Sequence, residues 1–396
     1  MTMMASAAHQ ALRRDELPGR YDLGLILAAA ALASLGVIMV ASSSIAIADG
    51  QHVGPFYYLT RHLVFLSLGI GVGIAVTRIE LHWFERNAFV LLLLAIILLL
   101  LVFVPGLGLR MNGARRWIRL GIAGFQSVEA VKLMFIVYLA SYLVRHREAV
   151  QARLSSVIKP LGVAVILVAL LLLQPDFGSA ALIIATTVGM VWLGGARMRN
   201  LFYLAVPMMP AIAWAAMTSD YRVRRLTSFL NPWEHPFDQG FQLTQALIAI
   251  GRGEWLGVGL GGSVQKLFYL PEAHTDFILA VIAEELGLAG ILLVLVLFAA
   301  LVGRALMLGL RAVERGQFFA GYCAFGIGVM LALQTLVSIG VNLGVLPTKG
   351  LTLPLISSGG SSVLMTCAAI GLLLRISFEV SRSENRLQAA SLEVTA

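Results

Sequence analysis

Apolar residues along the chain gather into ten runs, each close to the roughly 20 residues that an α-helix needs to cross a bilayer. Short polar segments separate most of these runs. The pattern predicts an all-α, polytopic membrane protein with about ten transmembrane helices. The expected spans are residues 22–48, 57–77, 87–106, 127–144, 157–174, 178–195, 200–218, 277–303, 317–341 and 353–376.

The polar sequence outside these runs defines the expected domain organisation. Residues 1–21 and 377–396 are predicted to be cytoplasmic tails, the second of them a candidate for disorder, and residues 22–376 form one transmembrane domain. The single long connection, residues 219–275, is predicted to be extracytoplasmic. Its interleaved aromatic residues and glycines favour an ordered, packed loop, and loops of this length are usually functional or disordered.

Composition and charge agree with this organisation. The chain is 59% hydrophobic and 13% charged, with a mean hydropathy of +0.87, which excludes a soluble domain of ordinary type. An even number of spans places both termini on one side, and the bias of basic residues toward that side makes it cytoplasmic. The net charge of +8 therefore reflects topology, and no nucleic-acid partner is expected. Cys323 and Cys367 both lie in apolar runs, so a disulfide framework is not expected.

Several arginines depart from the charge bias. They lie in segments predicted to be outside, and guanidinium groups bind phosphate and pyrophosphate bidentately. An anionic ligand explains this placement, and contacts with lipid head groups or acidic residues explain it equally well. The arginines are Arg110, Arg115, Arg116 and Arg119 in one short loop and Arg222, Arg224 and Arg225 in the long loop.

Asp276 is a carboxylate where a polar loop becomes an apolar helix. Such a group costs free energy unless it is paired or functional, which makes it a candidate site. The alternative is that Asp276 caps the helix by accepting hydrogen bonds from its first N–H groups. The residue pattern alone does not choose between these two interpretations.

Other polar residues fall inside or beside the predicted spans. Glu129 and Lys132 are three residues apart and share a helical face, so the pair is expected to face the bundle interior, where Lys132 could reach a phosphate. Glu284 and Glu285 lie two turns beyond Asp276 and are expected to hold helices together. Asp176 is expected to cap the helix that begins near Gly178.

Two further segments mix polar groups with apolar sequence. Glu272, His274 and Asp276 alternate and could present three ligands on one side, although the metal-site signal is weak. Residues 342–362 combine prolines, glycines and hydroxyl residues at membrane depth, where non-helical backbone must be buried in protein or line a cavity. Lys349 is the one basic residue there and could meet a phosphate or pair with an acidic residue.

Four motifs resemble one known family over nearly the whole chain. ARRW at 114–117, QPDFGSA at 174–180, LPEAHTDFI at 270–278 and LPTKGLTLPLISSGGSS at 346–362 are similar to the SEDS family (shape, elongation, division and sporulation). Lys349 makes the last motif more similar to the division members than to the elongation members. Two departures are a serine in place of the family's proline in residues 125–129, and a serine in place of its tyrosine within residues 357–362.

The resemblance implies a peptidoglycan glycosyltransferase that polymerises lipid II at the division septum, on the outer face of the cytoplasmic (inner) membrane. Asp276 matches the family's essential aspartate and is the expected general base. The expected partners are lipid II, a septal class B penicillin-binding protein and other membrane proteins of the divisome. Cations are expected to bind the departing pyrophosphate, and other residues to support the site. The candidate cations are Arg115, Arg116, Lys132, Arg222, Arg224 and Lys349, and the supporting residues are Glu129, His274, Glu284 and Ser361.

No cofactor is clearly required, since no set of metal ligands stands out, and a divalent cation such as Mg²⁺ or Mn²⁺ stays open. Two other functions also stay open. A lipid II flippase would explain a polar cavity, but it gives no special need for one outward carboxylate. A non-catalytic division scaffold would need only surfaces for partners and would leave the outward arginines unexplained.

Overall fold

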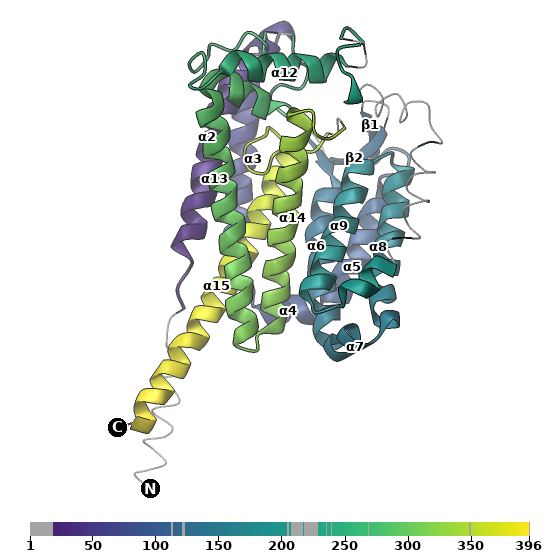
Figure 1. The fold of residues 1–396 in the computed structure, drawn as a ribbon, viewed down its shortest axis with the longest axis vertical. Coiled ribbons are helices and arrows are strands. Elements are labelled where there is room, and N and C mark those ends of the chain that lie inside the picture. The colour runs from purple at the N-terminus through teal and green to yellow at the C-terminus, as the bar shows by residue number, and fades with distance from the viewer. Residues whose placement is uncertain are drawn as a thin grey trace.

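The computed structural model is an upright bundle of long helices (Figure 1). It describes residues 19–111, 114–120, 123–203, 206, 217, 229–234, 236–238, 240–267, 269–347 and 350–395. Its helices are α2 Leu23–Gly50, α3 Tyr57–Thr77, α4 Leu81–Arg86, α5 Ala88–Leu101, α6 Ser127–Arg145, α7 Arg147–Ala152, α8 Leu154–Leu173, α9 Phe177–Leu193, α12 Phe241–Gly253, α13 Ile278–Glu314, α14 Phe318–Asn342 and α15 Gly360–Thr395.

The helices confirm a multi-pass membrane protein. Among the described residues, seven helices are long and apolar enough to cross a membrane, and α5 and α9 are shorter apolar helices. Together they account for nine of the ten predicted spans. The remaining prediction, residues 200–218, lies mostly outside the described residues.

Two predicted boundaries were wrong. The last span was predicted to start at residue 353, but residues 351–359 have no helical structure and α15 starts at Gly360. Apolar composition alone did not reveal this, because Pro354 and Gly359 disfavour a helix but lower the mean hydropathy of the run only slightly. The tail from residue 377 was considered a candidate for disorder, whereas α15 continues through it to Thr395.

The segment predicted to be an arginine-rich loop is a small antiparallel sheet. Strands β1 Gly108–Met111, β2 Ala114–Leu120 and β3 Ala123–Gln126 pair in sequence order. Side chains on a strand alternate between two faces. Ile118 is buried on one face of β2, whereas Arg115 and Arg119 are exposed on the other. The arginines made the segment look like a polar loop, although its buried and exposed positions alternate as in a strand.

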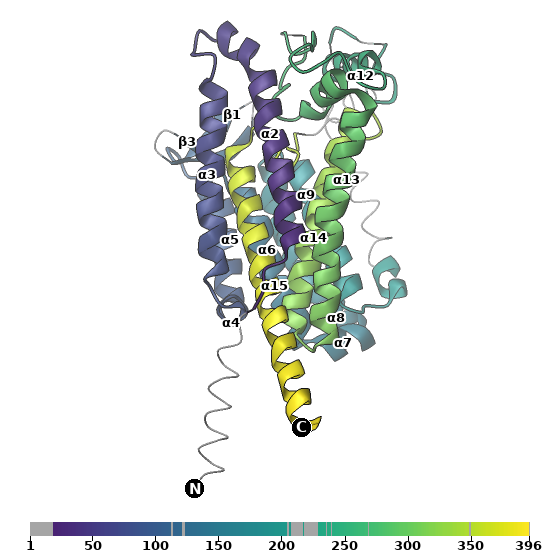
Figure 2. The same ribbon diagram turned by 90° about the vertical axis from the view of Figure 1, so that its left-hand side faces the viewer.

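Small residues allow close contacts between helices. A Cβ atom at Gly371 of α15 would lie 2.3 Å from the carbonyl oxygen of Gly73 in α3, so only glycine permits this approach. Close packing at small residues is the usual way that membrane helices associate. On the other side of the bundle α2 runs beside α13 (Figure 2), and Asp22 accepts hydrogen bonds from Arg304, the shorter at 2.6 Å.

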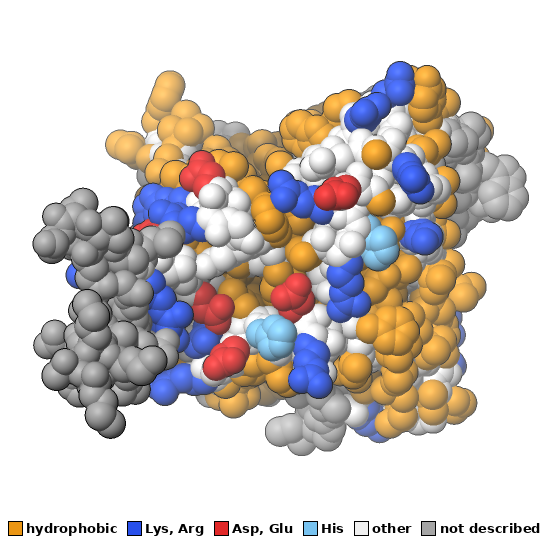
Figure 3. Space-filling view, turned by 90° about the horizontal axis from the view of Figure 1, so that it is seen from below, with side chains coloured by type: hydrophobic (Ala, Val, Ile, Leu, Met, Phe, Trp, Pro, Cys, Tyr) orange, Lys and Arg blue, Asp and Glu red, His pale blue; other side chains and the backbone are white. Residues whose placement is uncertain are grey.

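The molecule has two distinct ends. At one end the first described residues meet α15, where the N–H group of Asp22 donates to Ser377 Oγ at 3.1 Å. The helix α12 and the sheet lie at the opposite end (Figure 1). Seen from the end that carries the termini, Lys and Arg side chains are spread over the surface with a few acidic groups among them (Figure 3). Gly19, the first described residue, and the C-terminal part of α15 therefore lie at the same end of the bundle.

Candidate active site

Asp276 lies in the turn that leads into α13, at the end of the molecule away from the termini. Its side chain is half-buried, and the helix begins two residues later, at Ile278. Asn342, the last residue of α14, fixes this turn from the side. Its Nδ2 donates to the carbonyl oxygen of Asp276 at 3.0 Å, and its Oδ1 accepts from the N–H of Ala280 at 3.1 Å. Asn342 thus caps α13 and holds the main chain of Asp276.

The segment between α14 and α15 holds the same turn from another side. Ser357 Oγ donates to the carbonyl oxygen of Thr275 at 2.7 Å, and the N–H of Ser358 donates to that of His274 at 2.9 Å. A Cβ atom at Gly350 would lie 2.9 Å from Asp276 Oδ2. The Asp276 carboxylate therefore lies close to the main chain at Gly350. The expectation that non-helical backbone in residues 342–362 is buried in protein is met for residues 353–357, whereas Leu343, Val345 and Leu346 nearer α14 are exposed.

The predicted pair of Glu129 and Lys132 is present and buried. Lys132 Nζ lies 2.9 Å from Glu129 Oε1 and 2.9 Å from Gln334 Oε1. Gln334 in turn donates through Nε2 to the carbonyl oxygen of Thr352 at 3.0 Å. Two hydrogen bonds therefore connect Lys132 with the segment that lies against Asp276. Sequence reasoning found the pair and missed Gln334, because an amide in an apolar helix gives no sign of its partner.

Ser361 joins α15 to the start of α6. Its Oγ accepts from the N–H of Gln126 at 2.8 Å, one residue before α6 begins at Ser127. Ser362 Oγ accepts from Thr352 Oγ1 at 2.9 Å. Ser361 therefore supports the geometry of the site through backbone placement. The missing proline at position 127 does not prevent the helix from starting there.

His274 is buried next to Tyr58, with ring centroids 4.7 Å apart. Burial lowers the pKa of the imidazole; the nearby Glu272 opposes this shift and Arg61 adds to it. No three His, Cys, Asp or Glu side chains in the described ranges are placed to hold a metal ion. The weak ligand set of Glu272, His274 and Asp276 is therefore not assembled.

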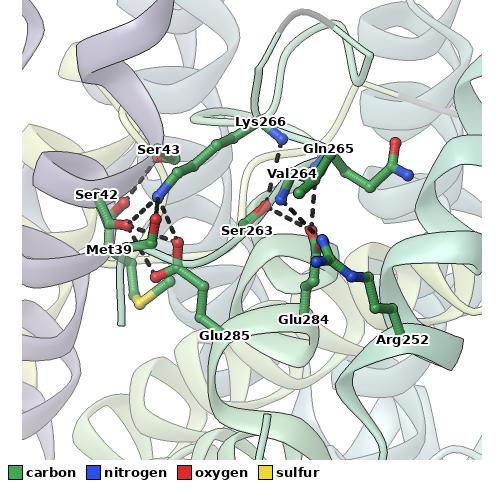
Figure 4. Close-up of polar contacts among 11 residues, drawn as sticks. Met39, Ser42, Ser43, Arg252, Ser263, Val264, Gln265, Lys266, Glu284 and Glu285 are labelled. Atoms are coloured by element: carbon green, nitrogen blue, oxygen red, sulfur yellow. Dashed lines mark hydrogen bonds and ion pairs between the residues drawn. The ribbon is translucent and has the colours of Figure 1, made fainter. Parts of the chain in front are cut away.

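Glu284 and Glu285 are fully buried and hold a loop against α13 (Figure 4). Glu284 pairs with Arg252 at 2.7 Å and also accepts from the Ser263 hydroxyl and the N–H of Val264. Glu285 pairs with Lys266 at 2.7 Å and accepts from Ser42. The expectation that these carboxylates hold the structure together is met, although Glu284 binds mostly the loop before Asp276.

The two candidate arginines of the sheet differ. Arg116 donates from Nε to the carbonyl oxygen of Gln174 at 3.2 Å and also to that of Pro175, so it braces the turn between α8 and α9. Arg115 is on the opposite face and exposed. Asp176 in that turn caps α9, as predicted, by accepting from the N–H of Ser179. The other candidate cations, Arg222, Arg224 and Lys349, lie outside the described residues.

These elements bring a half-buried carboxylate, a buried lysine and two polar segments to one end of a membrane bundle. Such a site belongs to a class of membrane protein that works on polar groups at the bilayer surface. A family model described as "Cell cycle protein", which takes its label from FtsW, RodA and SpoVE, matches residues 23–382. The chain belongs to this family.

Proteins similar in sequence to this chain agree with the family assignment. The chain is 56% identical to a "Probable peptidoglycan glycosyltransferase FtsW" of Xanthomonas oryzae pv. oryzae, over 96% of this chain and 78% of that one. It is 49% identical to the protein of the same name in Thioalkalivibrio sulfidiphilus, over 93% and 92% of the two chains. The resemblance to the division members is thereby confirmed.

Solved structures share the fold. A chain from a study of how a peptidoglycan synthase complex coordinates polymerization and crosslinking has a TM-score of 0.73 and 31% identity, with 91% of this chain and 98% of that one covered. The rod shape determining protein RodA of Thermus thermophilus has a TM-score of 0.65 and 29% identity, with 90% and 96% covered.

Proposed function

We propose that this chain is a peptidoglycan glycosyltransferase that polymerises lipid II, with Asp276 as the general base. The observation that carries the assignment of the base is the Asp276 turn. Its backbone is fixed from two sides by Asn342 and Ser357, while the carboxylate stays half-buried against Gly350. A base must be positioned and still be reachable by substrate, and this arrangement meets both needs. The names of the relatives supply the reaction.

The proposed reaction is a substitution at a sugar carbon. A sugar hydroxyl of one substrate attacks the anomeric carbon of another, a new C–O bond forms, and the bond to the polyprenyl pyrophosphate breaks. Asp276 takes the proton of the attacking hydroxyl. The negative charge that develops on the departing pyrophosphate requires nearby cations. Of the two candidate arginines in the sheet, Arg115 suits this role better, because it is exposed whereas Arg116 binds backbone carbonyls.

Lys132 is proposed to stabilise the negative charge of the departing pyrophosphate from within the bundle. Its ammonium group is held by Glu129 and Gln334, and Gln334 binds the segment beside Asp276. Among the described residues, no three His, Cys, Asp or Glu side chains are grouped to hold a metal ion.

The proposed place of action is the outer face of the cytoplasmic membrane at the division septum, with both termini in the cytoplasm. The proposed partner is a septal class B penicillin-binding protein that crosslinks the new glycan. The relative found in a peptidoglycan synthase complex supports a partnership of polymerisation with crosslinking.

The test is polymerisation of labelled lipid II by the purified chain in vesicles, with and without the penicillin-binding protein. Glycan product that depends on this chain is the expected result. Transport of lipid II without any polymer would favour a flippase. Neither polymer nor transport, with partner binding intact, would favour a scaffold.

A further inference from the structure

The helix α13 is interrupted inside its apolar length. Gly287 has φ 66° and ψ −161°, which no α-helix contains. The preceding loop inserts its backbone at this break. The carbonyls of Glu284 and Glu285 accept from the N–H groups of Val258 and Gly259, and the N–H groups of Leu288 and Ala289 donate to the carbonyls of Glu254 and Trp255. These four bonds measure 2.9, 3.1, 2.9 and 3.1 Å, respectively.

The chains approach so closely that glycines are required on both sides. A Cβ atom at Gly257 would lie 2.2 Å from the carbonyl oxygen of Glu285, and one at Gly287 would lie 2.4 Å from the backbone nitrogen of Gly257. Backbone at membrane depth needs all its hydrogen bonds made within the protein. The break in α13 provides four such bonds for the inserted loop.

Two polar clusters locate the break relative to the membrane. At the end with the termini, Asp22 of α2 pairs with Arg304 of α13. At the other end, Ser42 of α2 binds Glu285 of α13 (Figure 4). The two clusters are about 20 residues apart on each helix, or roughly 30 Å at 1.5 Å per residue, which is the thickness of the hydrocarbon layer. This spacing fits Asp22–Arg304 and Ser42–Glu285 as the two edges of that layer.

The inserted loop exposes large apolar side chains just inside the edge at Glu285. Trp255 and Leu256 are 75% and 80% exposed, and they lie beside Leu288 on the hydrocarbon side of Glu285. On α13 the exposed side chains of Leu288, Leu292 and Val296 continue as one stripe at four-residue spacing toward the other end. The loop thus extends the apolar surface of the helix. Tryptophan is the residue typical of the membrane interface.

We propose that residues 255–260 form a membrane-inserted loop, and that Trp255 and Leu256 bind the acyl chains of the leaflet at the end away from the termini. The occupant is lipid, because the surface is continuous with the lipid-facing stripe of α13. This binding surface is separate from the proposed chemistry. It anchors the loop that leads to the Asp276 turn.

A depth measurement on the full-length chain in phosphatidylglycerol and phosphatidylethanolamine vesicles tests the proposal. An environment-sensitive fluorophore is attached at Leu256→Cys, at Leu292→Cys as the lipid-facing control, or at Asp49→Cys as the aqueous control. Asp49 is exposed and lies seven residues beyond Ser42, about 10 Å outside the layer. The native Cys323 and Cys367 are buried, so labelling is directed to the introduced thiol.

Quenching by nitroxide lipids relative to quenching by aqueous iodide gives the result. The ratio at position 256 is expected to match that at 292 and to exceed that at 49 several-fold. A ratio at 256 equal to that at 49 overturns the proposal. Trp255→Phe gives a second reading: the tryptophan emission that it removes should be blue-shifted and sensitive to brominated lipids. Removal of only red-shifted, iodide-sensitive emission would likewise overturn it.

Discussion

Of the three carboxylates near the start of α13, Glu284 and Glu285 differ in environment from Asp276. Glu284 and Glu285 are fully buried, and each is bonded to a cation; Glu284 also accepts from three neutral donors and Glu285 from the Ser42 hydroxyl. Asp276 is half-buried, and the neighbouring elements hold its turn largely through main-chain groups. A buried carboxylate that is satisfied by fixed partners stabilises a structure but has no accessible basicity. A carboxylate whose backbone is fixed while its side chain stays accessible suits proton transfer.

The largest expected effect separates the base from the structural carboxylates. Asp276→Asn keeps the size of the side chain and its ability to accept a hydrogen bond at the helix start, and it removes the basicity. Polymerisation of lipid II by the purified variant is expected to fall about 10²–10⁴-fold, the usual contribution of a general base. Insertion and thermal unfolding in detergent should stay close to wild type. Normal polymerisation would contradict the assignment of Asp276.

Loss of a structural carboxylate should have the reverse signature. Glu285→Ala leaves Lys266 buried and without its ion pair, which typically costs about 3–5 kcal/mol. A clear drop in the melting temperature is expected, and activity should fall only as far as folded protein is lost. Glu284→Ala should cost less, because its partner Arg252 is 43% exposed and can be solvated.

The matched control for this prediction is the double variant Glu285→Ala with Lys266→Met. Removing both charges should restore part of the lost stability, since no unpaired ammonium group remains. If the double variant is as unstable as Glu285→Ala alone, the ion pair is not what holds the loop to α13.

The sheet offers a similar comparison between neighbouring arginines. Arg115→Ala is expected to weaken lipid II use without changing stability, because the side chain is exposed. A lost charge-assisted contact is worth about 1.5–3 kcal/mol, or roughly tenfold to a hundredfold in affinity. Arg116→Ala should instead lower the melting temperature, since the carbonyls of Gln174 and Pro175 lose their donor. Equal effects of the two variants on stability would break this distinction.

Much of this contrast could be predicted from the sequence. Hydropathy located the spans, the spacing of Glu129 and Lys132 predicted their pairing, and an isolated acidic residue at a helix start indicated Asp276. The partners of these residues could not be predicted. Asn342 and Gln334 are single amides whose significance depends on residues far along the chain.

Backbone irregularities were equally hidden. Gly287 lies in an apolar run where glycine is ordinary, so the break of α13 gives no signal until the loop of residues 254–259 is placed beside it. The sheet was missed because its arginines looked like a charge cluster. The local sequence pattern gave no information about the tertiary contacts of these segments.

The smallest expected effect concerns His274, the buried neighbour of Asp276. Burial lowers its pKa in the folded protein, while the unfolded chain keeps the ordinary value of 6.5. Above pH 6.5 both states are neutral at this residue, and it makes no contribution to the pH dependence. Below pH 6.5 the unfolded chain takes up a proton at this residue, and the folded protein does not. The free energy of unfolding therefore decreases as the pH is lowered from 6.5 to the lowered pKa of the folded protein. Melting temperatures between about pH 7.5 and 5 should therefore decline more steeply for the wild type than for His274→Gln, which cannot titrate. Parallel curves would mean that His274 is protonated as easily in the folded protein as in the unfolded chain, and its burial beside Tyr58 would have no electrostatic consequence.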